Sequence, residues 1–221
     1  MISIIIPAYN EEKYIEKTLL SLQQQTFRDF EIIVVANGCS DGTIQVARLY
    51  TTKIFDLKEP KASRARNVGA RASEKDILVF LDADTVLAAD ALDQIVRQFS
   101  SGYTVATLHS HPNTSRFVYV LMLEFKNFLH MLGVYHGSLG VIITRKRIFR
   151  QVGGFEEDRT IRENSSFIRK AEACGKYKVI RHTCATTSMR RYERWGLFKT
   201  IFFWGKNWML GKKEARYEAV R

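Results

Sequence analysis

The chain has 221 residues, of which 46% are hydrophobic and 26% are charged. A globular domain of this length buries about 70% of the surface of its unfolded chain, and this composition, with 13 Gly and 3 Pro, excludes disordered and collagen-like chains. The 34 Lys and Arg against 23 Asp and Glu give a net charge of +11. Such an excess indicates an anionic partner, namely nucleic acid, a nucleotide-activated substrate or an anionic membrane surface.

The first hundred residues alternate short apolar runs with helical patterns. Strands are predicted at 3–6, 31–36, 53–57 and 77–81. Helices are predicted at 11–25, 41–50, 62–72 and 88–99. Asn10 is expected to cap the first helix. This alternation favours an α/β fold with a mainly parallel, Rossmann-like sheet flanked by helices.

The second half of the chain is less regular. Helices are predicted at 117–132 and 163–173, strands at 139–144 and 177–180, and an amphipathic helical segment at 190–213. No linker or change of composition marks a second domain. We therefore predict one domain over residues 1–189, with residues 190–221 as a basic amphipathic helical extension of it.

Targeting and membrane-spanning segments are not evident. Charged residues interrupt both of the longest apolar stretches, 117–125 and 197–210, and the N-terminus has no basic region before its apolar run. The three cysteines have no metal-ligand spacing; they are Cys39, Cys174 and Cys184. These features predict a cytoplasmic protein, with peripheral contact at the cytoplasmic face of the membrane as an option.

Polar clusters follow the predicted strands, at 7–11, 37–42, 64–67 and 82–84. In an open parallel sheet, ligands bind outside the carboxyl ends of the strands, so these clusters should converge on one cleft. Asp82 and Asp84 offer the oxygen ligands that Mg²⁺ or Mn²⁺ prefers when it holds a diphosphate. A helix cap followed by a turn is the alternative interpretation of this pair. Arg66 is either a solvated helix residue or a phosphate ligand.

Five segments, in this order, resemble the motifs of family 2 glycosyltransferases: PAYNEE (7–12), NGCSDGT (37–43), ARNVGA (65–70), DAD (82–84) and GVIITRKRIFRQVGGFEE (140–157). The resemblance covers about residues 2–195. It implies the GT-A fold and transfer of a sugar from a nucleoside-diphosphate sugar with inversion at the anomeric carbon. It also implies a divalent metal, Mn²⁺ or Mg²⁺.

The resemblance carries roles for individual residues. Pro7 and Tyr9 would lie against the nucleotide base, and Glu11 near the ribose or the base edge. The diphosphate, its metal and the ribose would be bound by residues of the later motifs: Arg66, Asp82, Ala83 and Asp84. Asp82 and Asp84 are the expected metal ligands.

The chain departs from the family pattern after the second predicted strand, where the family has acidic residues and this chain has Ala36 and Asn37. Asn37 can still pair with a base edge, so the preferred base is left open. Arg191-Tyr192-Glu193-Arg194-Trp195 has the spacing of the Gln-x-x-Arg-Trp motif of processive relatives, with Arg in place of Gln. Arg190 and Arg191 are therefore expected either to close over the diphosphate or to begin a solvated helix.

A further departure concerns the catalytic base. The family's Glu-Asp pair aligns with Glu163-Asn164, and an amide does not accept a proton at neutral pH. Three explanations stay open: Glu163 serves as the base, the acceptor needs none, or the chain is a catalytically silent nucleotide- or glycan-binding relative. A lipid phosphate such as polyprenyl phosphate would need no base, because a phosphate monoester is largely ionised at pH 7. The acceptor classes considered are a glycan and a lipid phosphate.

Three histidines allow other interpretations. His182 could complete the metal site but is more simply a surface or core residue. His109 and His111 alternate on a predicted strand and share a face, but zinc would need further ligands that the sequence does not identify, so strand polarity is the simpler interpretation.

Most of the positive charge belongs to the C-terminal fifth of the chain. Residues 176–221 carry a net +9, whereas residues 1–175 carry +2. An apolar helical face is predicted there, separate from the lysines Lys199, Lys206 and Lys213; it consists of Phe198, Ile201, Phe202, Trp208 and Met209. This pattern predicts contact with a membrane surface, and packing onto the domain is the alternative. No nucleic-acid-binding motif is present, so nucleic acid is not an expected partner.

Overall fold

A computed structural model describes residues 1–134, 140–159 and 161–209, without the side chains of residues 204, 208 and 209. Its centre is an eight-stranded sheet in the order β3-β2-β1-β4-β7-β6-β8-β5. The strands are β1 (Ile2–Ala8), β2 (Phe30–Asn37), β3 (Lys53–Leu57), β4 (Ile77–Leu81), β5 (Thr85–Leu87), β6 (Tyr103–Pro112), β7 (Val141–Arg145) and β8 (Lys176–Thr187). The helices are α1 (Ile15–Gln23), α2 (Thr43–Arg48), α3 (Ala62–Ala72), α4 (Ala91–Gln98), α5 (Phe117–Met131), α6 (Lys146–Gln151), α7 (Glu163–Glu172), α8 (Arg190–Trp195) and α9 (Leu197–Met209).

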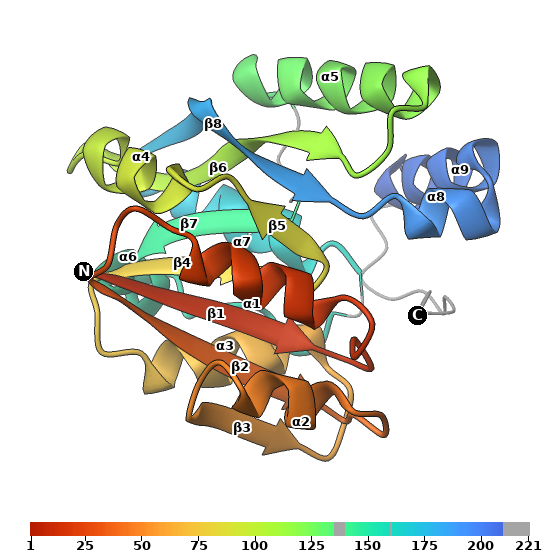
Figure 1. Cartoon of the computed structure of the whole chain (residues 1–221). Helices are drawn as coiled ribbons and strands as arrows, with labels where there is room; N and C mark the ends of the chain where they lie inside the picture. The colour runs from red at the N-terminus through yellow and green to blue at the C-terminus, as the bar shows by residue number, and fades with distance from the viewer. Residues whose placement is uncertain (135–139, 160, 210–221) are drawn as a thin grey trace.

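The sheet has a parallel half and a mixed half. Strands β1 to β4 pair in parallel, so their carboxyl ends reach the same edge, as predicted. Strand β7 then pairs antiparallel with both β4 and β6, an arrangement that the apolar pattern did not reveal. The α/β class is confirmed, and the first four predicted strands all form (Figure 1).

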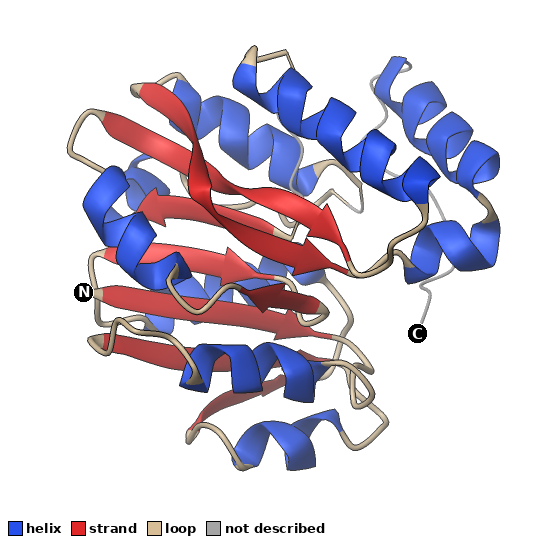
Figure 2. Ribbon diagram, turned by 45° about the horizontal axis from the view of Figure 1, so that its top comes forward, coloured by secondary structure: helices blue, strands red, loops and turns tan. Residues whose placement is uncertain are grey.

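Helices cover both faces of the sheet, and the alternation of side chains along each strand explains why (Figure 2). Ile4 and Ile6 of β1 belong to the apolar cluster that includes α1 and α4, whereas Ile5 packs into the cluster that includes α3, α6 and α7. Helix α3 lies close to β1, since a Cβ on Gly69 would come within 2.4 Å of Ile5 Cγ2. Both faces are therefore buried, which holds the carboxyl edge of the sheet rigidly.

The structure corrects several predicted boundaries. Helix α1 begins at Ile15 rather than at residue 11, and Asn10 is not its cap: its backbone is left-handed, with φ of 53°, and its side chain bonds to Ser40. The predicted helix 88–99 begins only at Ala91, after the short strand β5. The strand predicted at 177–180 continues to Thr187 through an irregularity in its pairing with β6.

The C-terminal segment is broken rather than continuous. Gly196 has φ of 82°, a conformation that favours glycine, and it separates α8 from α9. The predicted apolar face is described as far as Phe202, while the side chains of Trp208 and Met209, and all of Lys213, lie outside the described residues.

Helices α5, α8 and α9 form a layer beside the mixed half of the sheet (Figure 1). Tyr119 and Leu123 of α5 pack with Met189, and Tyr192 and Leu197 join this cluster from α8 and α9. Many large apolar side chains of this layer are exposed: Phe117, Val118, Leu121, Phe125, Phe128 and Met131 of α5, and Phe198, Ile201 and Phe202 of α9. None of the described helices combines the length and the apolar character needed to cross a membrane.

Candidate active site

The structure brings most of the predicted site residues to the carboxyl edge of the sheet. Pro7 is the penultimate residue of β1, Tyr9 and Glu11 follow the strand, and Asn37 ends β2. The segment from Asp82 to Asp84 connects β4 to β5. Helices supply the remaining residues from their first turns or interiors: Arg66 from α3, Glu163 and Asn164 from α7, and Arg190 and Arg191 from α8.

The loops after β1 and β2 hold each other through hydrogen bonds. The Glu11 amide donates to Thr43 Oγ1 (2.8 Å), and the Gly42 amide donates to Glu12 Oε2 (2.6 Å). Asp41 accepts hydrogen bonds from the Glu12 amide and from Thr43. The NGCSDGT segment thus fixes the loop that carries Glu11.

Arg66 is buried and bridges two carboxylates from different elements. Its Nη2 lies 3.0 Å from Asp82 Oδ1, and its Nη1 lies 3.3 Å from Glu163 Oε1. Its guanidinium also lies 5.5 Å from the centre of the Phe155 ring. Burial alone would lower the pKa of Arg66, but Asp82 and Glu163 outweigh burial and raise it, so the side chain stays cationic.

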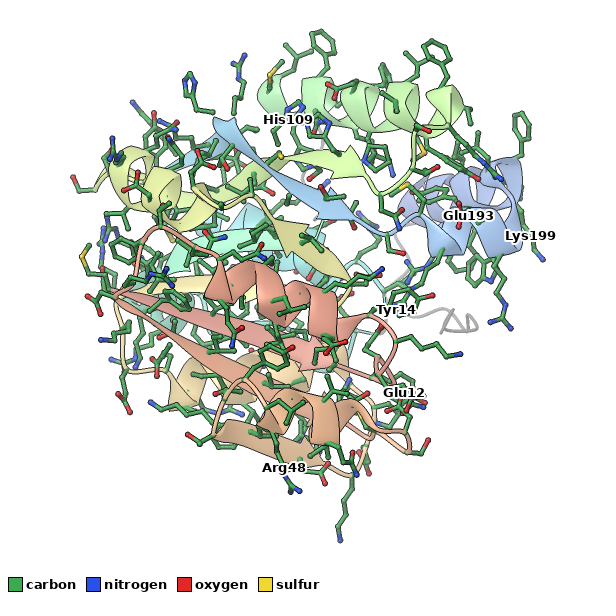
Figure 3. All side chains as sticks on the ribbon, in the orientation of Figure 1. Glu12, Tyr14, Arg48, His109, Glu193 and Lys199 are labelled. Atoms are coloured by element: carbon green, nitrogen blue, oxygen red, sulfur yellow. The ribbon has the colours of Figure 1, made fainter. Side chains whose placement is uncertain are left out.

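Arg190 forms a second bridge, from the start of α8. It pairs with both oxygens of Glu11, at 2.7 and 2.5 Å, and its Nη2 lies 3.1 Å from Asp84 Oδ2. The guanidinium also lies 4.3 Å from the centre of the Tyr14 ring, at the start of α1 (Figure 3). Helix α8 is thereby tied to the β1 loop and to the Asp82–Asp84 segment.

Among the carboxylates of this site, Asp84 has the pKa that is raised most clearly. Burial raises its pKa to about 6, with Asp82 and Glu11 adding to the shift and Arg190 and Arg191 opposing it. Burial likewise raises the pKa of Glu11, against the opposing effect of Arg190. A buried carboxylate that resists ionisation is stabilised by an added cation.

A divalent cation therefore fits this group. Two arginines link four carboxylates here: Arg66 pairs with Asp82 and Glu163, and Arg190 pairs with Glu11 and Asp84, with Arg191 nearby. Oxygen donors of this type suit Mg²⁺ and Mn²⁺. Asp82 and Asp84 stay the residues predicted to hold the ion.

Two further predicted residues have mainly internal contacts. The Asn37 side chain is 4% exposed, and its Oδ1 accepts a hydrogen bond of 2.7 Å from the Lys61 amide at the start of α3. Ala83 is also buried, and its carbonyl oxygen accepts a hydrogen bond from Thr18 Oγ1 at 2.8 Å. The Asn37 oxygen is thus engaged within the fold rather than presented to a base.

Asn164 carries an unusual feature at the position where the family has its base. Its Oδ1 is buried and has no hydrogen-bond partner among the described residues. A buried acceptor without a donor costs about 1–3 kcal/mol. Arg162, two residues earlier, has left-handed backbone with φ of 61°, as is common beside functional sites.

Sequence reasoning missed the residues that connect the ARNVGA segment to the GGFEE segment. Asn67 is buried; its Oδ1 accepts from the Phe155 amide, and its Nδ2 donates to the Phe155 carbonyl and to Glu157, all at 2.9 Å. Gly154 has φ of 70° and leaves no room for a Cβ, which would lie 2.7 Å from Asn67 Oδ1. Asn67 therefore positions Phe155 against Arg66. The sequence signal that could have identified Asn67 was its position directly after Arg66 in the ARNVGA segment.

His182 is not brought into the cleft. It is exposed within the irregular part of β8, and its neighbour Thr183 bonds to Asp90 at the start of α4. On β8, His182 is five residues before Thr187. Thr187 is the residue of β8 that pairs with Thr85, which follows Asp84.

Comparison with known proteins adds independent evidence. The sequence model of the protein family described as Glycosyl transferase family 2 matches residues 3–210 of this chain. An uncharacterized glycosyltransferase of Haemophilus influenzae is 29% identical over 182 residues, which cover 77% of this chain and 61% of that protein. The O-antigen chain rhamnosyltransferase RfbN of Salmonella typhimurium is 26% identical over 232 residues, covering 92% of this chain and 74% of that protein.

Solved structures show the same fold at low sequence identity. The mannosyltransferase PcManGT from Pyrobaculum calidifontis, in complex with GDP-Man and Mn²⁺, matches 98% of this chain and 65% of its own with a TM-score of 0.75 and 18% identity. Residues 1–349 of Staphylococcus aureus TarS in complex with UDP match 90% of this chain and 65% of that chain with a TM-score of 0.70 and 21% identity. The present chain thus spans less than two thirds of both of these structures, and 61% and 45% of the two Haemophilus influenzae relatives.

Proposed function

The chain belongs to glycosyltransferase family 2, and from this premise we propose that its cleft transfers a sugar from a nucleoside-diphosphate sugar to an acceptor, with the aid of a divalent metal. The expected GT-A fold is confirmed by the solved structures. The observation that carries the proposal is the pair of arginine bridges: Arg66 and Arg190 join four carboxylates from the β1 loop, the β4–β5 connection and the start of α7. A diphosphate needs both cationic groups and a metal, and this cleft offers the residues for both.

The donor would bind across the first two loops and the two arginines. Pro7 and Tyr9 would lie against the base. Glu11 would lie near the ribose, after its ion pair with Arg190 has opened or has become shared with the donor. Asp82 and Asp84 would hold Mn²⁺ or Mg²⁺, and Ala83 would lie beside the donor. A bound divalent ion neutralises charge on the diphosphate oxygens. The matched TarS structure is a complex with UDP, and the matched PcManGT structure is a complex with GDP-Man and Mn²⁺. These complexes support a nucleoside-diphosphate sugar as the donor.

The reaction places developing charge on the leaving diphosphate. An acceptor oxygen forms a bond to the anomeric carbon as the bond from that carbon to the diphosphate oxygen breaks, and the electron pair leaves with the nucleoside diphosphate. Arg66, Arg190 and Arg191 would stabilise this charge. Preorganised cationic donors are effective because they need little reorganisation during the reaction.

Glu163 is our candidate for the base. Its carboxylate would accept the proton of the attacking hydroxyl, while the unpartnered Oδ1 of Asn164 would accept a hydrogen bond from a second hydroxyl of the acceptor. An ionised phosphate brings no such donor. Asn164 therefore favours a glycan acceptor over a lipid phosphate.

The proposal is tested by transfer assays with radiolabelled UDP- and GDP-sugars, Mn²⁺, and either a glycan or a polyprenyl phosphate acceptor. We expect transfer to the glycan, loss of about 10²- to 10⁴-fold in Glu163→Gln, and little loss in the surface control Glu74→Gln, whose side chain is 69% exposed. Exclusive transfer to polyprenyl phosphate would contradict the assignment of Glu163 and Asn164. Donor binding without any turnover would support a catalytically silent relative instead.

We also propose that the layer of α5, α8 and α9 contacts an anionic membrane surface. Phe198 and Phe202 are 86% and 70% exposed on α9, and α5 presents further exposed aromatic side chains beside it. The C-terminal region carries most of the net positive charge. Apolar side chains combined with basic charge are typical of segments that bind at the surface of anionic lipid bilayers.

Liposome co-sedimentation tests this contact with vesicles that contain 30% phosphatidylserine. We expect a Phe198→Ser, Phe202→Ser variant, and truncation after Arg194, to reduce binding, whereas Leu49→Ser should not. Leu49 is a matched control because it is 74% exposed at the end of α2, in the parallel half. Unchanged sedimentation of the double variant and of the truncated chain would overturn the proposal.

A further inference from the structure

A cluster of metal-ligating side chains lies outside the donor cleft, between β6 and α5. His109 and His111 of β6 face Glu124 of α5: His109 Nε2 is 3.2 Å and His111 Nδ1 is 3.6 Å from the same oxygen, Glu124 Oε1. The three ligand atoms all lie within 4.8 Å of one another. Figure 3 shows His109 where the sheet approaches α5.

The fold explains why these residues meet. His109 and His111 are two residues apart on β6, so they share one face, and their ring centres are 4.8 Å apart. Glu124 and Asn127 are three residues apart on α5 and therefore face the same strand. The alternation of the two histidines was visible in the sequence, but the third ligand comes from a helix whose packing the sequence did not reveal.

Asn127 lies beside His109 and is fixed by hydrogen bonds to the backbone of β6. The Asn127 side chain is 2% exposed, and its orientation is fixed because Oδ1 accepts from the Ser110 amide while Nδ2 donates to the Ser110 carbonyl. The same Nδ2 lies 3.2 Å from His109 Nε2, and a metal ion on that nitrogen would take its single lone pair in place of this contact. An unprotonated ring nitrogen is the form that ligates a metal.

His109 Nε2 lies 3.2 Å from Glu124 Oε1. This separation suits two ligands of one zinc ion, because Zn–N and Zn–O distances of about 2.0–2.2 Å place ligand atoms about 3.3 Å apart in a tetrahedral site. Two imidazoles and one carboxylate match the donor set of known three-ligand zinc sites, in which water takes the fourth position. The side chains of His111 and Glu124 are each 44% exposed, so a metal ion has access from solvent.

We propose that His109, His111 and Glu124 form a zinc-binding site that fastens the middle of α5 to β6. The site is separate from the oxygen-rich donor cleft, and zinc binding there does not depend on the proposed glycosyl transfer. Its position gives it a structural consequence, because α5 carries both Glu124 and the exposed apolar side chains of the outer layer. A bound ion would restrict the movement of this helix relative to the sheet.

Calorimetric titration of the full chain with ZnCl₂, at pH 7.5 and with excess Mg²⁺ to occupy the donor cleft, tests the proposal. We expect one zinc site in the wild-type protein and an affinity at least about tenfold lower in His111→Gln and in Glu124→Gln. His182→Gln is the matched control, since it removes an exposed histidine outside the cluster and should leave zinc affinity unchanged. Circular dichroism of each variant establishes that it is folded.

Two further measurements make the result decisive. Asp84→Asn should retain the zinc site, which distinguishes the cluster from the donor cleft even if the proposed transferase function fails. The Co²⁺-substituted protein should show visible absorption bands that Glu124→Gln alters. No zinc binding by the wild-type protein at 100 μM, or equal affinity in wild type, His111→Gln and Glu124→Gln, would overturn the proposal and leave an ordinary His–Glu contact.

Discussion

Arg66 and Arg190 each join two carboxylates of the same cleft, but they belong to very different parts of the molecule. Arg66 lies on α3, which packs closely on β1, and its neighbour Asn67 is locked to the Phe155 turn. Arg190 begins α8, a short helix that has no fully buried residue and is followed by a break at Gly196. One bridge is therefore part of the core, and the other attaches a peripheral helix to it.

This difference separates two tasks that the sequence motifs do not distinguish. The Arg66 bridge should contribute to folding as well as to donor binding, because its loss leaves Asp82 and Glu163 without their buried cation. The Arg190 bridge should contribute mainly to donor binding, since α8 can move without unfolding the sheet. Substitution of each arginine tests this division.

The largest effect is expected for Arg66→Gln. Removing one partner of a buried ion pair typically costs about 3–5 kcal/mol, because the other charges remain buried and unpaired. Chemical denaturation should show a loss of this size. The control Arg64→Gln, on the exposed side of the same helix, should change stability by less than about 0.5 kcal/mol. Equal effects of the two substitutions would contradict the assignment of Arg66 to the core.

The raised pKa of Asp84 predicts a pH-dependent stability that depends on this one carboxyl. Burial raises its pKa to about 6, above the usual range of an aspartate, so the folded protein holds this proton more tightly than the unfolded chain does. The proton on Asp84 therefore stabilises the folded state. This stabilisation is about 3 kcal/mol; it is complete below about pH 4 and is lost as the pH rises through 6.

Denaturation of metal-free protein at pH 4 and at pH 7.5 measures this loss. Asp84→Asn should lack that part of the pH dependence. Added Mn²⁺ should stabilise the wild-type protein more at pH 7.5 than at pH 5, because the ion competes with the proton. An identical pH dependence in wild type and variant would show that Asp84 is not the titrating group.

Arg190→Gln should produce a smaller change in stability, about 1–3 kcal/mol, because hydrogen bonds between charged groups contribute on this scale. Its main effect should be on the donor, with KM for the nucleotide sugar raised by about tenfold or more. Lys199→Gln, on the exposed surface of α9, is the control and should leave KM unchanged. A loss of stability as large as that of Arg66→Gln would remove the distinction between the two bridges.

The smallest effect is expected for Tyr14→Leu, which removes the ring beneath the Arg190 guanidinium. Interactions of this kind contribute about 0.5–1 kcal/mol. The donor KM should rise by about threefold, and combining Tyr14→Leu with Arg190→Gln should add nothing further. Fully additive effects in this double-mutant cycle would show that the ring does not act through Arg190.

The parallel half of the fold and the location of the cleft could be predicted because their signals are local. Each buried strand ends in a polar segment, and the parallel order brings those ends to one edge. The antiparallel strand β7 and the irregular pairing of β8 could not be predicted, since apolar runs do not specify strand direction.

Contacts between distant segments account for most of what was missed at the site. The Glu11–Arg190 bridge joins residues 179 positions apart, and the Asn67–Phe155 contact joins residues 88 positions apart. The contact of Asn37 was not predicted for the same reason, because its partner Lys61 follows another strand. The break at Gly196 is an exception, since a glycine inside a helical pattern is a local signal.

The central claim is that Asp82 and Asp84 hold a divalent metal with a nucleoside diphosphate, and isothermal titration tests it most directly. UDP and GDP are titrated into the wild-type protein, Asp84→Asn and the surface control Asp93→Asn, each with and without Mn²⁺. We predict that at least one nucleotide binds the wild type and Asp93→Asn in a Mn²⁺-dependent manner, and that Asp84→Asn binds it at least about tenfold more weakly. Equal, Mn²⁺-dependent affinity in Asp84→Asn, or binding that does not respond to Mn²⁺ in the wild type, would contradict the account.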